Sequence, residues 1–140
     1  MSNNLVLIDT SVWVMFLRKS PPPAVEDEVG HLLAENRVAI FPVIHLELLG
    51  GTKSLNGFNR LKSRLDALHQ IPASEATWEV AAQLSFELRQ RGKVIPYTDI
   101  LIGSAAILAD ALLLHADKHF DLMAEDTDLN VKSLVSMVNR

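Results

Sequence analysis

The sequence predicts an α/β fold in which helices cover both faces of a central parallel sheet. Three short apolar runs, at residues 5–8, 38–41 and 112–114, are typical of strands that are buried on both faces. Segments with helical spacing of apolar residues separate these runs, and such alternation is the pattern of a parallel sheet. Right-handed crossovers then bring the carboxyl ends of the strands to one edge, where open α/β sheets bind their ligands.

The first strand, at 5–8, is expected to lead directly into a helix over about residues 11–18. Three prolines at 21–23 end this helix, because proline lacks the amide hydrogen that a helix interior needs. A second helix is predicted over 24–36, where apolar residues recur on one face. Asn36 is suited to a left-handed helix end.

The next unit begins with the strand at 38–41, and Pro42 is placed where a helix can start. Glycines 50–51 end that helix. A third helical stretch follows over 52–68, with an apolar face and several basic residues pointing elsewhere. Residues 69–71 are predicted to form a short edge strand.

A long helix is predicted to begin at the N-cap residue Ser74 and to run to about Arg91, where Gly92 closes it. Trp78 is assigned to the buried stripe of this helix, and Trp13 is likewise assigned to the core. The buried stripe is expected to contain Trp78, Ala81, Ala82, Leu84, Ser85 and Leu88.

The last third of the chain is expected to hold a helix that begins near Pro96 and a strand over 112–115. Several acidic residues between 121 and 128 are interpreted as a solvated loop. Residues 130–135 are predicted to form a second edge strand.

The composition fits one domain over residues 1–140. Hydrophobic residues make up 49% of the chain, which is typical of a globular protein. The chain has no cysteine, which excludes disulfides and thiolate metal sites and favours the cytosol. We expect a cytoplasmic protein, because we find neither a signal peptide nor an apolar run of about 20 residues that could span a bilayer. A net charge of -4 disfavours nucleic-acid binding through a broad basic surface.

Four carboxylates are expected to meet at the carboxyl edge of the sheet. Asp9 and Asp117 each follow an apolar strand, whereas Glu47 and Asp99 lie in helices that start from the same edge and face inward by their spacing. Each one alone also fits a helix cap or an ion pair. Like charges at close range destabilise one another, so four converging carboxylates require a cation. Such oxygen ligands suit Mg²⁺ or Mn²⁺, ions that serve phosphate-ester chemistry.

The ordered set of motifs at residues 9–13, 47–50, 98–103 and 117–120 resembles the PIN-domain ribonucleases, and among them the VapC-type toxins of toxin–antitoxin pairs. The resemblance covers essentially the whole chain. It implies a PIN-like α/β/α sandwich with a five-stranded parallel sheet. It also implies Mg²⁺- or Mn²⁺-dependent endonucleolytic cleavage of RNA.

The resemblance further implies the site residues. The four acidic positions of the family fall on Asp9, Glu47, Asp99 and Asp117. Asp9, Asp99 and Asp117 are expected to hold a divalent ion, and Glu47 to bind an ion as well or to orient the attacking water. The family's hydroxyl position, which orders the metal and its ligands, falls on Ser11. Thr10 is assigned to the turn.

The partners follow from the resemblance and from the charges. The family implies a type II toxin that pairs with a cognate antitoxin, that forms homodimers and that cleaves RNA to 5′-phosphate and 3′-hydroxyl ends. We expect a basic rim to steer the RNA substrate. Its candidate residues are Lys53, Arg60, Lys62 and Arg64, together with Arg18, Lys19 and Lys118.

Two positions depart from the common pattern of the family. Many members carry Thr or Ser where this chain has His115, and an Asp where it has His119. The chain therefore lacks a small hydroxyl and an auxiliary acid. Zinc bound by His115 and His119 is disfavoured, because no cysteine assists and His115 ends a strand instead of sharing a helix with His119.

Two other functions stay open from the sequence. A phosphoryl-transfer domain would use Asp9 as a nucleophile, although such hydrolases usually carry a second Asp where this chain has Ser11. A receiver-like or RNA-binding module would use the acidic pocket without cutting RNA.

Overall fold

A five-stranded sheet with all strands parallel is the centre of the computed structural model, which describes residues 4–138. The strand order is β3-β2-β1-β4-β5. This confirms the predicted α/β class and the expected number of strands. The strands are β1 (Val6–Ile8), β2 (Val38–Ile40), β3 (His69–Gln70), β4 (Leu112–His115) and β5 (Val131–Ser133).

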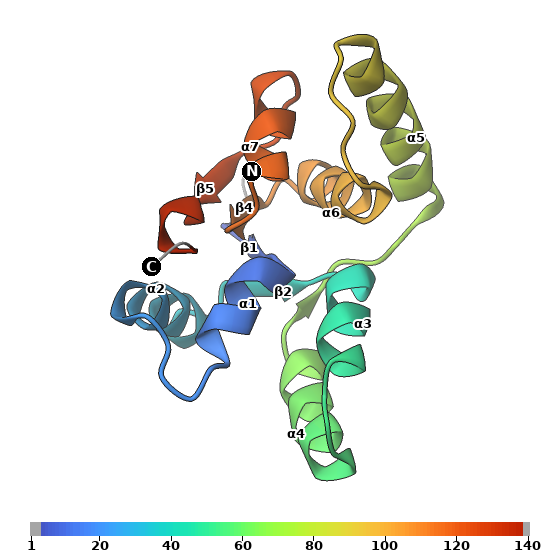
Figure 1. Cartoon of the computed structure of the whole chain (residues 1–140). Helices are drawn as coiled ribbons and strands as arrows, with labels where there is room; N and C mark the ends of the chain where they lie inside the picture. The colour runs from blue at the N-terminus through green and yellow to red at the C-terminus, as the bar shows by residue number, and fades with distance from the viewer. Residues whose placement is uncertain (1–3, 139–140) are drawn as a thin grey trace.

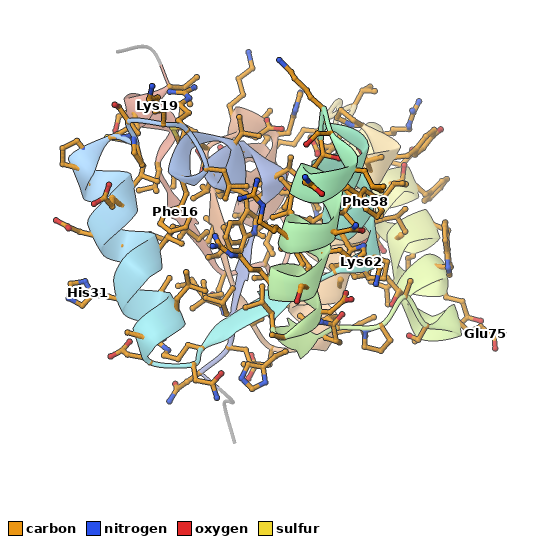
Figure 2. The ribbon with its side chains drawn as sticks, turned by 90° about the horizontal axis from the view of Figure 1, so that it is seen from below. Phe16, Lys19, His31, Phe58, Lys62 and Glu75 are labelled. Carbon is orange, nitrogen blue, oxygen red and sulfur yellow. The ribbon has the colours of Figure 1, made fainter. Side chains whose placement is uncertain are left out.

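Helices cover both faces of this sheet. Figure 1 shows α1 and α2 on one side, and α6 with α5 outside it on the other. Figure 2 looks onto the first of these faces, where α4 lies beside α1 and α2. The helices are α1 (Thr10–Phe16), α2 (Pro23–Ala34), α3 (Pro42–Gly50), α4 (Leu55–Asp66), α5 (Glu75–Gln90), α6 (Tyr97–Leu108) and α7 (Lys118–Glu125), and a 3₁₀ turn follows at Val135–Met137.

The central strand β1 sets the position of the first predicted site residue. Both neighbours pair with it: Val6 lies opposite Val38 of β2 and opposite Leu112 of β4. Its residues are buried because helices cover both sides, which explains the purely apolar run. The backbone N–H of Asp9 donates to the carbonyl of Leu114 at 2.9 Å, so this pairing continues to the point where β1 ends.

The predicted element ends agree with the structure to within a few residues. Asn36 adopts the left-handed conformation with a φ of 57°, and Gly92 does so with a φ of 79°. Pro42 begins α3, and Ser74 caps α5 through a hydrogen bond from the N–H of Thr77. Both edge strands are also present, as β3 and β5.

The sequence analysis interpreted the acidic residues between 121 and 128 as a solvated loop, but the first part of this stretch is helical. Asp121 and Glu125 belong to α7. The side chain of Asp117 caps this helix by accepting from the N–H of His119, and Phe120 and Met123 bury one of its faces. An N-cap and a short apolar face are therefore sufficient to make this charged segment helical.

The assignment of Trp78 to the core is wrong. Trp78 is 58% exposed on α5, whereas Trp13 is buried as predicted. Helix α5 packs on α6 outside the sheet and buries a narrow stripe that contains Thr77, Ala81 and Leu88. Trp78 lies one residue past Thr77 and therefore about 100° around the helix, which turns it away from this stripe.

Within residues 4–138, no helix is long and apolar enough to span a bilayer.

Candidate metal centre

Asp9 and Ser11 link the ends of the neighbouring strands β1 and β4. Asp9 is the N-cap of α1, and its Oδ2 accepts hydrogen bonds from the backbone N–H of Ser11 at 3.0 Å and from the Ser11 hydroxyl at 2.6 Å. The same hydroxyl oxygen accepts from the backbone N–H of Ala116, beyond β4, at 2.9 Å. Ser11 thus holds the Asp9 carboxylate in one orientation and fixes the end of β1 to the chain that leads to Asp117.

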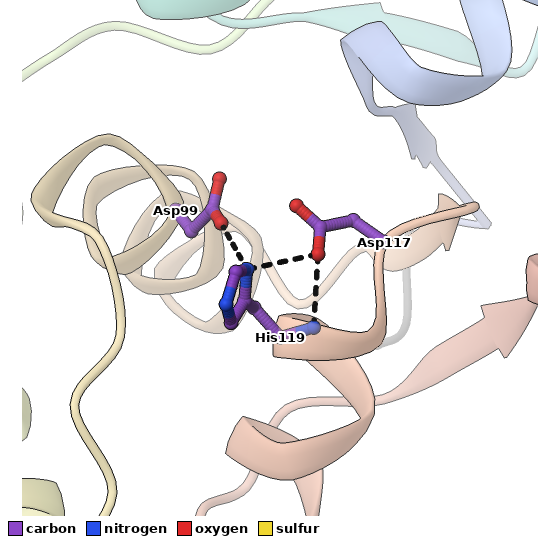
Figure 3. Close-up of side chains that lie close together, drawn as sticks. All are labelled: Asp99, Asp117 and His119. Atoms are coloured by element: carbon purple, nitrogen blue, oxygen red, sulfur yellow. Dashed lines mark hydrogen bonds and ion pairs between the residues drawn. The ribbon is translucent and has the colours of Figure 1, made fainter.

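Asp99, Asp117 and His119 form the most compact group of possible metal ligands in the described part of the chain. One ligand atom of each lies within 4.8 Å of those of the other two. Asp99 lies in the first turn of α6, and Asp117 precedes α7. The Nδ1 atom of His119 lies 3.0 Å from Oδ1 of Asp117 and 3.3 Å from Oδ2 of Asp99, and Figure 3 shows its ring beside both carboxylates. The sequence analysis placed His119 where many family members carry an acid and disfavoured it as a zinc ligand together with His115.

A chain of hydrogen bonds behind Asp117 starts from the buried ring of His115. Its Nδ1 accepts from the backbone N–H of Asp117 at 3.1 Å, so its Nε2 carries the proton and donates to Oδ1 of Asp121, also at 3.1 Å. The Ser133 hydroxyl donates to the other oxygen of Asp121 at 3.0 Å. Helix α7 and strand β5 therefore support the Asp117 backbone through His115, in place of the small hydroxyl expected there.

Glu47 is exposed, contrary to the expectation that it faces an apolar interior. It lies in α3 near the start of α1, where its Oε1 accepts a hydrogen bond from the Thr10 hydroxyl at 2.7 Å. Thr10 is therefore more than a turn residue. The motif order in the sequence does not reveal this contact, because Thr10 and Glu47 come from separate units of the fold.

Electrostatics connect all four predicted acids. Burial raises the pKa of Asp9, which is 5% exposed, and the Asp117 charge adds to this, against the lowering effect of the bonds from Ser11. Burial also raises the pKa of Asp99, to about 8, with the charge of Asp117 and a hydrogen bond to it as the next causes. The charges of Asp9 and Glu47 raise it further. Negative charge is therefore concentrated at this edge of the sheet.

These side chains fit a divalent cation. Carboxylate oxygens are ligands of Mg²⁺ and Mn²⁺, and imidazole nitrogen is a ligand of many transition ions. The Nδ1 atom of His119 is buried, and no donor or acceptor in the described residues meets it with hydrogen-bond geometry. A cation between the carboxylates would offset their repulsion and would give this nitrogen a partner.

A groove with basic residues lies next to Glu47. Four basic residues line it: Arg18 after α1, Lys53 before α4, and both Arg60 and Arg64 of α4. Lys62, which the sequence interpretation placed in the same rim, does not line the groove; its Nζ donates to Oδ2 of Asp66 at 2.6 Å. Alternate positions on a helix point to different sides, which separates Lys62 from its two arginine neighbours.

Replacing Ser11 should lower the stability of the fold, because the substitution leaves the backbone N–H of Ala116 without an acceptor. In Ser11→Ala, Asp9 loses a hydrogen bond and Ala116 N–H loses its acceptor, so we expect about 1–3 kcal/mol less stability in urea unfolding. Thr10→Ala is the matched control, since it removes an exposed hydroxyl contact and should change stability by no more than about 0.5 kcal/mol. Equal losses in the two variants would contradict the role assigned to Ser11.

The raised pKa of Asp99 predicts how stability depends on pH without metal. The folded chain keeps a proton on Asp99 up to a pKa of about 8, whereas the unfolded chain releases it near the ordinary value of 3.8. The folded state is therefore favoured most below pH 3.8, and this advantage is lost as the pH rises to about 8. Melting curves in EDTA should show the wild type losing stability relative to Asp99→Asn across this window. Parallel pH curves would show that Asp99 titrates normally.

The PIN-domain family matches residues 6–126 of the chain. Ribonuclease VapC11 of Mycobacterium tuberculosis and the VapC ribonuclease Mb1587 of Mycobacterium bovis are each 32% identical to it over 133 residues, which is 92% of this chain and 98% of the relative.

Solved structures share the fold. VapBC2 from Rickettsia felis, bound to a DNA fragment from the promoter, superposes with a TM-score of 0.76 at 24% identity, over 92% of this chain and 98% of the other. VapBC-5 from Mycobacterium tuberculosis, a member of the VapBC family of toxin–antitoxin systems, gives 0.59 at 18% identity, over 93% and 97%. With the family match over residues 6–126 and the 32% identity to two ribonucleases, the chain belongs to the PIN-domain family and, within it, to the VapC group.

Proposed function

We propose that this chain is a metal-dependent endoribonuclease, the toxin of a type II toxin–antitoxin system, with its whole length of 140 residues forming one PIN domain. The observation that carries the proposal is the convergence of Asp99, Asp117 and His119 within 4.8 Å beside the buried Asp9. Relatives named as VapC ribonucleases at 32% identity support it. Asp9 and Asp117 each cap a helix, but capping does not require the carboxylates to lie this close to one another, and a cation would offset their repulsion.

The ligand set of the divalent ion, Mg²⁺ or Mn²⁺, is Asp9, Asp99 and Asp117, with Glu47 at the exposed side of the site. When bound, such an ion activates water, orients the phosphate and neutralises charge on the leaving oxygen. Ser11 keeps the Asp9 carboxylate oriented, and His115 holds the backbone of Asp117. Glu47 is exposed and accepts from Thr10, so its second oxygen is available to orient the attacking water.

RNA reaches this site along the groove of Arg18, Lys53, Arg60 and Arg64. The groove includes Glu47 in its lining, so its basic residues lead to the acidic centre. Basic side chains bind phosphates and hold the strand while the carboxylates act on one linkage. This local arrangement reconciles RNA binding with the net charge of -4.

The partner is a cognate antitoxin, and the complex is cytoplasmic. Solved neighbours of this fold are described as VapBC complexes, one of them as a member of a family of toxin–antitoxin systems. A phospho-aspartate mechanism is less favoured, because Asp9 is 5% exposed and its Oδ2 is occupied by two hydrogen bonds from Ser11.

Cleavage of labelled RNA by the purified chain, free of antitoxin, tests the proposed activity. We expect cleavage with Mg²⁺ or Mn²⁺, none with EDTA, and a drop of more than roughly 100-fold for Asp9→Asn, since loss of a ligand should exceed the loss of an outer-shell contact. Asp27→Asn, which changes an exposed carboxylate on α2, should cleave normally. Cleavage that survives EDTA would contradict the proposal, whereas normal binding without cleavage would favour an RNA-binding module.

The salt dependence of RNA binding tests the groove. In an Asp9→Asn background that does not cut, the double change of Arg60→Ala and Arg64→Ala should weaken binding. Each phosphate contact on single-stranded RNA contributes roughly 0.7 to the slope of log K against log salt concentration. Loss of the two arginine contacts should therefore reduce the magnitude of this slope by about 1.4. Lys62→Ala, on the same helix but outside the groove, is the matched control and should leave the slope unchanged. Unchanged RNA binding in the double variant would contradict the proposal that RNA binds along this groove.

We also propose that a second copy of the chain covers the apolar surface of α5 and α6. Trp78, Phe86 and Tyr97 are 58%, 64% and 67% exposed, and they surround a hollow lined by Ile100 and Leu101. Contiguous exposed aromatic residues are typical of an interface. Sedimentation should give a dimer for the wild type and a monomer for Phe86→Asp. Leu55→Asp, on exposed α4, should stay dimeric, and a monomeric wild type would contradict this assignment.

A further inference from the structure

His119 occupies a special position in the acidic centre. Its backbone N–H donates to Oδ1 of Asp117 at 2.9 Å, which fixes it in the first turn of α7. Its ring nitrogen Nδ1 lies 3.0 Å from that same oxygen and 3.3 Å from Oδ2 of Asp99. The ring therefore reaches the space between two helices that approach the edge from different parts of the chain (Figure 3).

The Nδ1 atom of His119 is buried, yet its contacts are not hydrogen bonds. Of the described side-chain nitrogen and oxygen atoms that are buried, only this nitrogen and Nε1 of Trp13 have no partner with hydrogen-bond geometry. A protonated ring that only neutralised the carboxylates would align its N–H with one of them. A nitrogen that points between two carboxylate oxygens without such alignment instead suits a lone pair directed at a shared cation.

The chemistry of the ligand set then bears on which cation binds. Mg²⁺ prefers oxygen ligands in a near-ideal octahedral arrangement. Mn²⁺ is a transition-metal ion and binds sites that contain a nitrogen ligand more tightly than Mg²⁺ does. The common pattern of the family has an acid at this position, so this chain replaces an oxygen ligand with an imidazole. The other proposed ligands, Asp9, Asp99 and Asp117, offer oxygen alone.

We propose that His119 is a nitrogen ligand of the divalent ion and that it shifts the selectivity of this site from Mg²⁺ towards Mn²⁺. The inference rests on the proposed function only in that the acidic centre binds a divalent ion; it does not depend on RNA cleavage. His115 cannot take this role, because both of its ring nitrogens are engaged, with Asp117 N–H and with Asp121.

Calorimetric titration of the full chain with Mn²⁺ and with Mg²⁺ tests the selectivity. We expect the wild type to bind Mn²⁺ more tightly, and His119→Asp, which restores an oxygen ligand, to lower the ratio of the two affinities several-fold while still binding both ions. His119→Asn provides a second variant of similar size in case the added charge disturbs folding. His31→Asp is the matched control, since His31 is exposed on α2 and points away from the body of the protein (Figure 2), and its affinity ratio should equal that of the wild type.

Pulsed electron paramagnetic resonance of bound Mn²⁺ gives a direct readout of the ligand. Coupling of Mn²⁺ to ¹⁴N should be present in the wild type and in His31→Asp and absent in His119→Asp. An ion that binds without ¹⁴N coupling, or an affinity ratio unchanged by both His119 variants, would overturn the inference and leave the nuclease proposal standing. If neither Mn²⁺ nor Mg²⁺ binds, or if Asp99→Asn does not abolish the binding, both this inference and the nuclease proposal would be overturned.

Discussion

Repulsion among carboxylates at one sheet edge is the constraint on which the rest of this structure depends. A parallel sheet directs the ends of β1 and β4 to the same side, so the acids that follow them must lie near each other. Burial and the charge of Asp117 raise the pKa of Asp99 to about 8, which measures how unfavourable this arrangement is without a counter-charge. A cation would supply that counter-charge, and the hydrogen bonds made by Ser11 and His115 hold Asp9 and Asp117 in place.

Hydrogen bonds from uncharged donors hold these acids in place. The Ser11 hydroxyl satisfies Asp9 and Ala116 at once, which joins the ends of two strands without adding charge. Behind Asp117, the ring of His115 accepts from the Asp117 N–H and is hydrogen-bonded to Asp121, which Ser133 also contacts. Outer contacts of this kind orient ligands and tune a metal site, so the network around Asp117 determines the geometry that an ion meets. The imidazole ring of His115 therefore supports the backbone of Asp117 at the position where many family members carry a small hydroxyl.

Much of the fold could be predicted from local patterns, because apolar strands, helix caps and glycine ends are local properties. The strand ends placed Asp9 and Asp117 in the right part of the structure, and the first turn of α6 placed Asp99. Other features depend on packing between distant segments. The contact of Thr10 with Glu47, the exposure of Trp78 and the approach of His119 to Asp99 each depend on how separate helices sit against one another. Motif order placed His119 where many family members carry an acid, and only its position in the structure reveals a ring nitrogen that lies close to two carboxylates.

The measurement that tests the account most directly is proton release when Mn²⁺ binds the metal-free chain. Titrations at pH 7 in two buffers with different ionisation enthalpies give the number of protons released. Because Asp99 keeps its proton up to a pKa of about 8, an ion that binds there must displace it, and we predict about one proton released at pH 7, falling towards none well above pH 8. Binding of Mn²⁺ at pH 7 with no proton released would mean that the carboxylates are already ionised and that their clustering does not create the cation site.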